Sequence, residues 1–439
     1  MIKIGFVGDI ALTHSYDALY GAKGPHYPFE RIRELLAGHD ILIGNLEAPL
    51  CLGGEPYPFK VCLKTHPGYA EGMKEAGITA LSLANNHILD YREQAMYETM
   101  GCLEMQGIGW FGAGASIEEA NRPAIIERGG ISLGVLSRSE VTIDSPFYAS
   151  EQERGIAPLD LKELAHAVAS LKGRVHAVAV CLHWGKEDWR YPSPDQVRTA
   201  HEIIDMGADL IIGHHPHVLQ GIERYRWGHI AYSLGNFLFS DLDWRWVNSE
   251  GEVVHAFMKL NRARRESAVF SADISETGVH RVSLTGCRTG TDLRAAPVDN
   301  PGRFEAGMRV LSAPITMRGY AAFWSVYDEL RIRWAQMRYQ MKRARKAYKI
   351  GPYLIRKARS GAPARPHAEE RAGTWKQEGR PQDDHRARSG TMPARTEPAS
   401  QNGEPRAGSR EQKHRQPGEI HRDLETLGKY RQKNHTLIS

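Results

Sequence analysis

The segment GADLIIGHHPH, residues 207–217, joins a short apolar run to three histidines within four positions. The run Leu210–Ile212 is typical of a buried strand, and imidazoles beside such a strand are costly to bury unless they bind something. Four more apolar runs end in polar side chains suited to binding a metal or moving a proton. These endings are Asp9, Asn45 with Glu47, Asn85-Asn86-His87, and His183. Five strand ends of this kind favour one shared functional site over five unrelated turns.

Short β-rich runs alternate with helical patterns over residues 1 to about 290. Strands are predicted at Ile2–Val7, Ile41–Gly44, Ile78–Leu83, Ile131–Leu136, Val175–Leu182, Leu210–Ile212, Ile230–Ser233, Val253–Leu260 and Val279–Leu284. Helices are predicted at Pro28–Ala37, Gly68–Ala76, Arg92–Gln106, Leu159–Leu171 and Ser193–Met206. The alternation predicts a layered α/β domain with largely parallel strands, and antiparallel pairing after about Ile230. Ligands of such sheets bind outside the carboxyl ends of the strands, which is where the polar endings lie.

Composition limits the functions that the chain can have. The 439 residues are 41% hydrophobic and 25% charged, as in soluble globular proteins, and the net charge of +5 is too weak to indicate a nucleic-acid partner. No apolar run reaches the roughly 18 residues of a membrane-spanning helix. Met1 leads directly into a predicted strand, without the pattern of a signal peptide. Five scattered cysteines without a CxxC pair argue against disulfides and favour a reducing, cytoplasmic or peripheral membrane location.

Three regions differ in composition. Residues 1–290 form the predicted α/β domain, residues 291–360 a helical, basic extension, and residues 361–439 a disordered tail that is poor in apolar side chains. Within the extension, residues 331–359 contain eleven Lys or Arg and no acidic residue. An apolar stripe recurs at three- and four-residue steps: Leu330, Trp334, Met337, Met341, Ala344 and Tyr348. The stripe either packs on the core, with the charges simply solvated, or binds anionic lipid or an anionic polymer.

The side chains at the five strand ends indicate metal chemistry. Oxygen and imidazole donors without thiolates suit Mn, Fe or Zn. Such donors on rigid strand ends can hold two ions about 3.5–4 Å apart, as in phosphoester hydrolysis, with a further imidazole to protonate the leaving group. Nearby, Asn236 is expected to hydrogen-bond substrate or a ligating histidine. Glu187 is as consistent with the cleft as with a solvated loop, and Asp188 is assigned to a solvated loop.

Six motifs in a fixed order resemble one known family. They are GD at 8–9, GNLEAP at 44–49, LANNHILDY at 83–91, HWGKE at 183–187, GADLIIGHHPHVLQGIE at 207–223 and YSLGNFLFS at 232–240. Together they resemble the CapA-type poly-γ-glutamate capsule-biosynthesis proteins, which are similar in turn to the calcineurin-like metallophosphoesterases. The resemblance covers roughly residues 1–245. It implies a four-layer α/β/β/α sandwich, with two sheets face to face and helices outside.

The resemblance also implies roles for individual residues. The implied metal ligands are Asp9, Asn45, Asn86, His183, His215 and His217, and Glu47 is expected to supply a carboxylate that Asn45 lacks. His87 is implied as the general acid. Asn85, Glu187, His214 and Asn236 are expected to contact substrate or ligands. Two positions depart from the phosphoesterase pattern, because Ala11 replaces a histidine and Asn45 a bridging aspartate. One tightly held ion and an altered pair that uses Glu47 therefore both remain open.

The implied function is metal-dependent hydrolysis or transfer at a phosphoester or amide. It would serve the biosynthesis, processing or export of an anionic capsule polymer such as poly-γ-glutamate. The expected partners are that polymer or a phosphorylated substrate, and a peripheral membrane or capsule synthesis complex. The alternative is a non-catalytic, metal-stabilised assembly component of a capsule or polysaccharide synthesis machinery.

Overall fold

The computed structural model describes residues 1–57, 60–141, 147–247 and 253–359, and the tail predicted at 361–439 lies outside these residues. The chain forms two compact units, Met1–Val326 and Tyr327–Ser439. The first unit contains both large sheets and the predicted site residues. Of the second unit, the structure describes most of helix α10 (Tyr320–Arg359), which begins in the first unit. No helix in the described ranges is long and apolar enough to cross a bilayer.

Strand β1 (Ile2–Ala11) lies inside an eight-stranded sheet with the order β18-β17-β16-β1-β2-β3-β4. On one side of β1 the strands are parallel: β2 (Ile41–Leu46), β3 (Ala80–Ser82) and β4 (Gly109–Phe111). On the other side they are antiparallel: β16 (Glu266–Ser275), β17 (Gly278–Thr289) and β18 (Ala295–Pro297). The eighth strand, β13 (Asn236–Phe239), also pairs with β1. The antiparallel pairing predicted after about Ile230 is confirmed for β16, β17 and β18, whereas β13 is parallel to β1.

A second sheet has six strands. Its order is β11 (Ile222–Tyr225), β12 (Gly228–Ala231), β10 (Leu210–His214), β9 (Ala177–His183), β7 (Ile131–Ser139) and β6 (Ala124–Arg128). The four inner strands are parallel, and the two outer strands are antiparallel to their neighbours. The parallel strands read as continuous apolar runs because both of their faces are buried.

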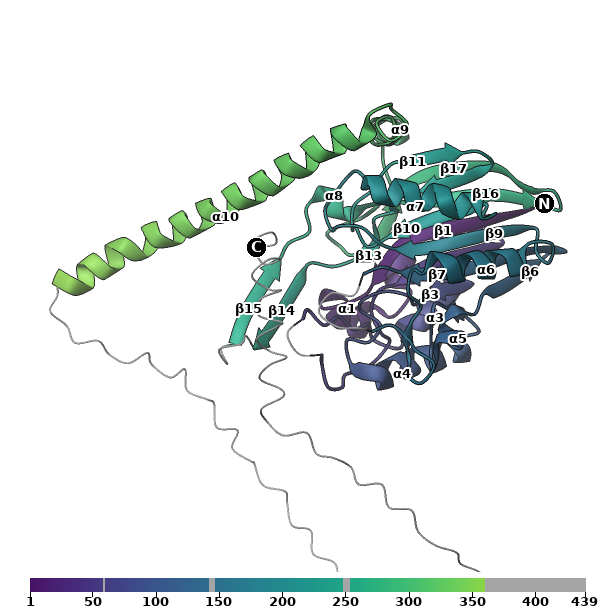
Figure 1. The fold of residues 1–439 in the computed structure, drawn as a ribbon. Coiled ribbons are helices and arrows are strands. Elements are labelled where there is room, and N and C mark those ends of the chain that lie inside the picture. The colour runs from purple at the N-terminus through teal and green to yellow at the C-terminus, as the bar shows by residue number, and fades with distance from the viewer. Residues whose placement is uncertain (58–59, 142–146, 248–252, 360–439) are drawn as a thin grey trace, which may run out of the picture. The chain divides into compact units, whose positions relative to one another are not determined.

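The two sheets pack face to face, with helices on both outer surfaces (Figure 1). Ile41 and Ile43 of β2 share one core with Ala177 and Ala179 of β9, whereas the intervening Leu42 packs in a different core on the outer side. Helices α1 (Ser15–Lys23), α2 (Arg33–Ala37), α3 (Tyr69–Glu75) and α4 (Arg92–Met105) pack on the first sheet. Helices α6 (Leu161–Leu171) and α7 (Pro194–Asp205) pack on the second. The predicted α/β/β/α sandwich is confirmed.

Shorter elements connect these layers. They are η1 (Tyr27–Phe29), β5 (Ala113–Gly114), α5 (Ile117–Asn121), β8 (Gly155–Ile156), β14 (Leu242–Val247), β15 (Val253–Met258), α8 (Arg262–Arg265) and α9 (Pro301–Ser312). The strands β5 and β8 pair with each other, and so do β14 and β15. The segment that follows residue 291 contributes β18 and α9 to the first unit.

Candidate metal centre

In each sheet, the polar side chains near the strand ends are in register with one another on neighbouring strands. Asp9 of β1 is in register with Asn45 of β2 and with Asn236 of β13, and both pairings of β1 are irregular beside Asp9. In the second sheet, His183 of β9 is in register with His214 of β10. All five side chains are buried. Irregular strand pairing of this kind often occurs beside active sites, where it redirects a side chain.

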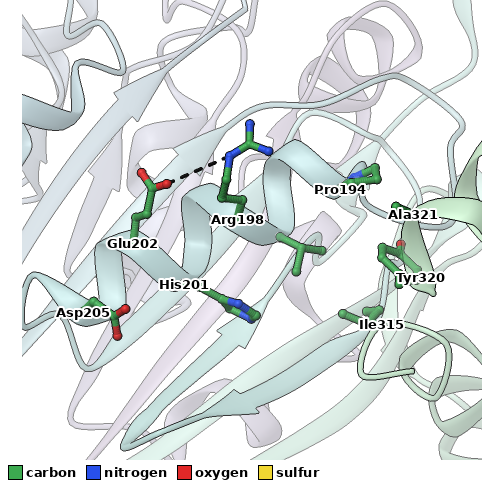
Figure 2. A pocket seen from close by; sticks show the side chains of 9 residues that line it. Pro194, Arg198, His201, Glu202, Asp205, Ile315, Tyr320 and Ala321 are labelled. Atoms are coloured by element: carbon green, nitrogen blue, oxygen red, sulfur yellow. Dashed lines mark ion pairs between the residues drawn. The ribbon is translucent and has the colours of Figure 1, made fainter. Parts of the chain in front are cut away.

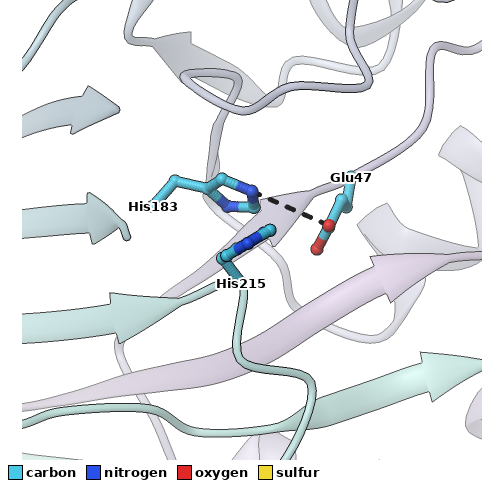
Figure 3. Close-up of side chains that lie close together, drawn as sticks. All are labelled: Glu47, His183 and His215. Carbon is cyan, nitrogen blue, oxygen red and sulfur yellow. Dashed lines mark ion pairs between the residues drawn. The ribbon is translucent and has the colours of Figure 1, made fainter. Parts of the chain in front are cut away.

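Two groups of potential metal ligands share Glu47. One consists of Glu47, His183 and His215, and the other of Asp9, Glu47 and His217; within each group the ligand atoms lie within 4.8 Å of one another. In Figure 3 the side chains of the first group point toward one another. Glu47 Oε1 lies 3.3 Å from His217 Nε2 and 3.8 Å from His183 Nε2. A carboxylate shared in this way could serve a metal ion held by either group.

The donor atoms of this centre fit a metal ion. Buried polar atoms in folded proteins are nearly always hydrogen-bonded. Within the described part of the chain, however, Glu47 Oε1 and His215 Nδ1 are buried and make no hydrogen bond. Burying such atoms without a partner is costly. Carboxylate and imidazole donors without thiolates are the set that suits Zn, Fe or Mn.

The two buried carboxylates differ in their preference for charge. Burial raises the pKa of Glu47 well above its usual value, and the nearby charge of Asp9 raises it further. Burial acts on Asp9 too, but hydrogen bonds from His214 and His217 outweigh it and hold the pKa of Asp9 well below its usual value. Of the two carboxylates, Glu47 is therefore the one whose negative charge is less well compensated by its neighbours.

The imidazoles are held mostly in their neutral, ligating form. Burial lowers the pKa of His183 well below its usual value and lowers the pKa of His215 to about 4. Burial also lowers the pKa of His217, but Asp9 and the charge of Glu187 outweigh it, so that the net shift is upward. Metal binding requires the neutral imidazole, and a bound cation would displace the proton that the carboxylates favour on His217.

Backbone strain supports a functional role for the loop after β10. His215 has φ 90° and His217 has φ 56°, in the left-handed region that residues other than glycine rarely occupy. Each such residue costs about 1–3 kcal/mol and persists only where its surroundings hold it in place. His217 is held by Asn236, whose Oδ1 lies 2.9 Å from His217 Nδ1. The contact predicted between Asn236 and one of the candidate ligands is present.

Asn45 is engaged differently from the other predicted ligands. Its Nδ2 donates to Asp9 Oδ1 at 2.9 Å and to Glu47 Oε2 at 3.3 Å, and its Oδ1 accepts from Asn85 Nδ2 at 3.1 Å. The amide thus holds the two carboxylates in place, and its oxygen is already occupied. Asn86 is closer to a ligand position, because its Oδ1 lies 2.8 Å from His183 Nε2.

His87 is paired with a buried carboxylate that the motif reading did not single out. His87 Nδ1 lies 2.7 Å from Asp90 Oδ2, and the His87 side chain is 12% exposed. Lys60 Nζ lies 2.5 Å from Asp90 Oδ1, and both side chains are buried. Asp90 thus orients the His87 ring through Nδ1, and Nε2 is the ring nitrogen that Asp90 does not contact. The spacing of three residues between His87 and Asp90 is the sequence signal that could have identified this pair. No sequence signal points to Lys60.

Glu187 lies near the histidines, and an arginine holds its loop. The Glu187 side chain is 42% exposed. Its partial desolvation would raise its pKa, but His217, His215 and Arg264 lower the pKa to about 2. Arg264 of α8 donates to Asp188 at 2.6 and 2.7 Å and to Glu187 at 3.3 Å. The Arg264 carbonyl also accepts from Asn236 Nδ2 at 3.0 Å. Sequence reasoning missed Arg264, and it assigned Asp188 to a solvated loop although Asp188 forms this ion pair.

Two other candidate sites in the described part of the first unit are either exposed or have their charges already paired. His26, Glu71 and Glu75 could also surround an ion, but all three are exposed by 41–55%. A hollow of about 350 Å³ lies between α7 and residues 315–321 (Figure 2). Its charged groups are paired, Arg198 with Glu202 at 4.0 Å and Asp205 with Arg226 at 3.0 Å. None of the predicted site residues lines this hollow.

The fold and the site together define a class: a four-layer α/β/β/α protein with a buried centre of imidazoles and carboxylates at its strand ends. Residues 3–241, more than half of the chain, match the family described as bacterial capsule synthesis protein PGA_cap. The chain belongs to this family, and the predicted membership in the CapA-type capsule-biosynthesis proteins is confirmed.

Individual relatives agree with this assignment. The chain is 32% identical over 250 residues to the capsule biosynthesis protein CapA of Bacillus anthracis, covering 55% of this chain and 61% of that protein. It is 29% identical over 303 residues to the PGA biosynthesis protein CapA of Bacillus subtilis (strain 168), covering 68% of this chain and 79% of that protein. A solved structure of a putative 5′-nucleotidase from Staphylococcus aureus is similar at 13% identity and a TM-score of 0.39, over 69% of this chain and 55% of that one.

Proposed function

We propose that this protein is a metal-dependent enzyme that acts on an anionic capsule polymer, such as poly-γ-glutamate, or on a phosphorylated precursor of it. The polymer class rests on the relatives, which are named for capsule and PGA biosynthesis. The reaction is hydrolysis or transfer at a phosphoester or amide bond. It takes place in association with the machinery that makes, processes or exports the polymer.

The observation that carries this proposal is that two groups of buried donors share Glu47. His87 is also close enough to His215 and His217 for their charges to interact. Asp9, Glu47, His183, His215 and His217 would hold one or two ions of Mn, Fe or Zn. A bound divalent ion polarises an oxygen of the substrate and lowers the pKa of water.

We assign to His87 the role of moving a proton. Asp90 accepts the Nδ1 proton of His87, which fixes the tautomer and orients the ring, and Nε2 then passes a proton to the leaving group. Burial lowers the pKa of His87, and Asp90 opposes this shift. An anionic substrate group beside the ring would favour the imidazolium further, so that the acid forms when substrate is bound.

A non-catalytic, metal-stabilised assembly component is the second candidate. Ala11 and Asn45 favour it, because they remove one donor and one charge from the usual two-ion set. The buried His87–Asp90 pair favours the enzyme, because an ion that only stabilises the fold requires no proton donor. Lys60 adds to this argument, because its ammonium lies 2.5 Å from Asp90 Oδ1 inside the protein and offsets the charge of that carboxylate.

The deciding experiment measures metal and activity on one preparation of the full chain. Elemental analysis gives metal content, and the same sample is assayed on a phosphodiester and on a γ-glutamyl amide. His215→Ala with His217→Ala should lose both metal and activity, and His201→Ala, outside the centre, should lose neither. Stoichiometric metal without turnover of either substrate would favour the assembly component. Wild-type protein that is active without metal would refute both candidates.

A further inference from the structure

Helix α10 carries an exposed apolar stripe. Four of its side chains, spaced so that they share one helix face, are 45–61% exposed: Leu330, Trp334, Met337 and Met341. The sequence continues the same spacing with Ala344 and Tyr348. The exposed part of the stripe, from Leu330 to Met341, is about 17 Å long at the rise of an α-helix. Continuous exposed apolar surface of this kind marks an interaction site.

The charge of the same segment is strongly one-sided. Residues 331–359 hold eleven of the 57 Lys and Arg of the chain and none of its 52 Asp and Glu. Positive charge lies directly beside the stripe, because the guanidinium carbons of Arg331 and Arg338 are 5.6 and 4.6 Å from the ring centroid of Trp334. An indole between two arginines is suited to the boundary between apolar and anionic surroundings.

A second copy of the helix does not suit this surface. The stripe has the spacing of the core positions of a coiled coil, and Arg331, Arg333 and Arg338 flank it at the positions that face the partner helix. In a parallel pair Arg333 would face Arg338. In an antiparallel pair Arg331 and Arg338 would face the equivalent positions of the partner, which are arginine at 331, 338 and 345. Like charges across such an interface are destabilising. The partner should therefore be anionic as well as apolar.

We propose that the stripe of α10 and its flanking arginines and lysines bind an anionic lipid surface. Apolar side chains would enter the acyl region while the long basic side chains reach the headgroups, as in interfacial amphipathic helices. A soluble anionic polymer would use the charges but leave the apolar stripe exposed, so lipid fits the surface better. This inference does not depend on the metal centre or on catalysis.

The test is co-sedimentation of the full chain with vesicles of phosphatidylcholine alone and of phosphatidylcholine with phosphatidylserine, at 0.1 and 0.5 M salt. Binding should require the anionic lipid and weaken at high salt. A basic residue near an anionic surface contributes roughly fivefold to partitioning. Replacing four of them by Gln should therefore lower the partition coefficient at least about tenfold; the four are Arg331, Arg338, Lys342 and Arg345.

Matched variants separate lipid binding from charge alone. Gln at four exposed arginines of the first unit should leave binding unchanged; these are Arg198, Arg226, Arg303 and Arg309. Trp334→Ser with Met337→Ser should weaken binding at constant charge, and Met105→Ser with Met317→Ser, also at exposed positions, should not. Circular dichroism establishes that each variant keeps its helix content.

Four results would overturn the inference. The first is no sedimentation with anionic vesicles at 0.1 M salt, and the second is equal binding to neutral vesicles. The third is wild-type binding by the Trp334→Ser, Met337→Ser variant together with full competition by soluble poly-γ-glutamate, which would make the helix a polymer-binding surface instead. A dimer that buries the stripe and prevents vesicle binding would count against it as well.

Discussion

Both candidate ligand groups depend on Glu47, so Glu47→Gln is the sharpest perturbation of the proposed metal centre. The side chain is fully buried, and its Oε1 lies 3.3 Å from His217 Nε2. Gln keeps the size of the side chain but removes the negative charge from both groups at once. Without metal we expect the free energy of unfolding to change by less than about 1 kcal/mol. The reason is that burial already raises the pKa of Glu47 and favours its neutral form.

Metal should reveal the difference between the two proteins. A ligand that binds only the folded state, at 100 times its Kd, adds about 2.7 kcal/mol to the free energy of unfolding. Losing a group that merely orients a ligand weakens metal binding about 10–100-fold, so loss of Glu47 itself should reach at least the upper value. At the same metal concentration the variant then gains only about 0.4 kcal/mol. The two proteins should differ by about 2 kcal/mol.

The assay is urea unfolding of both proteins with Mn²⁺ or Zn²⁺ and, separately, with EDTA. Glu223→Gln is the control, because Glu223 is also buried but pairs with His201 and Tyr232 outside the centre. The control should gain as much stability from metal as the wild type. Equal stabilisation of wild type and Glu47→Gln by metal would show that Glu47 is not a ligand.

Four further outcomes follow from the site. His87→Asn should retain metal by elemental analysis but lower turnover about 10²–10⁴-fold. Asp90→Asn leaves the buried Lys60 ammonium without its carboxylate, and urea unfolding should show a loss of about 3–5 kcal/mol. Arg264→Gln should weaken metal affinity about tenfold by calorimetry, by releasing its loop. In metal-free protein the pKa of His215 is about 4, against 6.5 ordinarily. As the pH falls, the unfolded chain therefore takes up a proton at His215 before the folded protein does. The contribution of His215 to stability should therefore be complete above about pH 6.5 and fall by about 3 kcal/mol by pH 4, so that His215→Gln should lose about 3 kcal/mol less than the wild type when unfolding is measured from pH 7 to 4.

The main strands could be predicted because they are buried on both faces. β2, β9 and β10 begin as unbroken apolar runs that lead into glycine or polar side chains, and in β1 only Lys3 interrupts the apolar residues and glycines before Asp9; this pattern can be recognised without knowledge of the partner strands. β16 was missed although it pairs with β1, because serines interrupt its apolar residues. Ser267 and Ser271 are buried, and Ser271 Oγ lies 2.8 Å from His39 Nε2. A partner 232 residues away is what makes a polar side chain acceptable there.

The site residues also differ in whether the local sequence or a long-range contact determines their role. The candidate ligands could be named because each follows its own strand. Lys60 and Arg264 could not, since their carboxylate partners lie 30 and 76 residues away in sequence and carry no local signal. The orientation of Asn45 was equally hidden, because it is set by a hydrogen bond from Asn85 across 40 residues. Sequence motifs identify a position, and tertiary contacts decide which atom of that side chain faces the centre.

The charge balance of the centre bears on whether it holds one ion or two. Asp9 and Glu47 are the carboxylates of the two ligand groups, and together they neutralise one divalent ion. Asn45 adds no charge, and its oxygen already accepts from Asn85. Glu187 lies nearby, but Arg264 offsets its charge. A second ion would leave the buried centre with excess positive charge, which is costly without a counter-charge. An anionic substrate supplies that counter-charge, so we expect one ion to be held tightly in the free protein and a second to bind together with substrate.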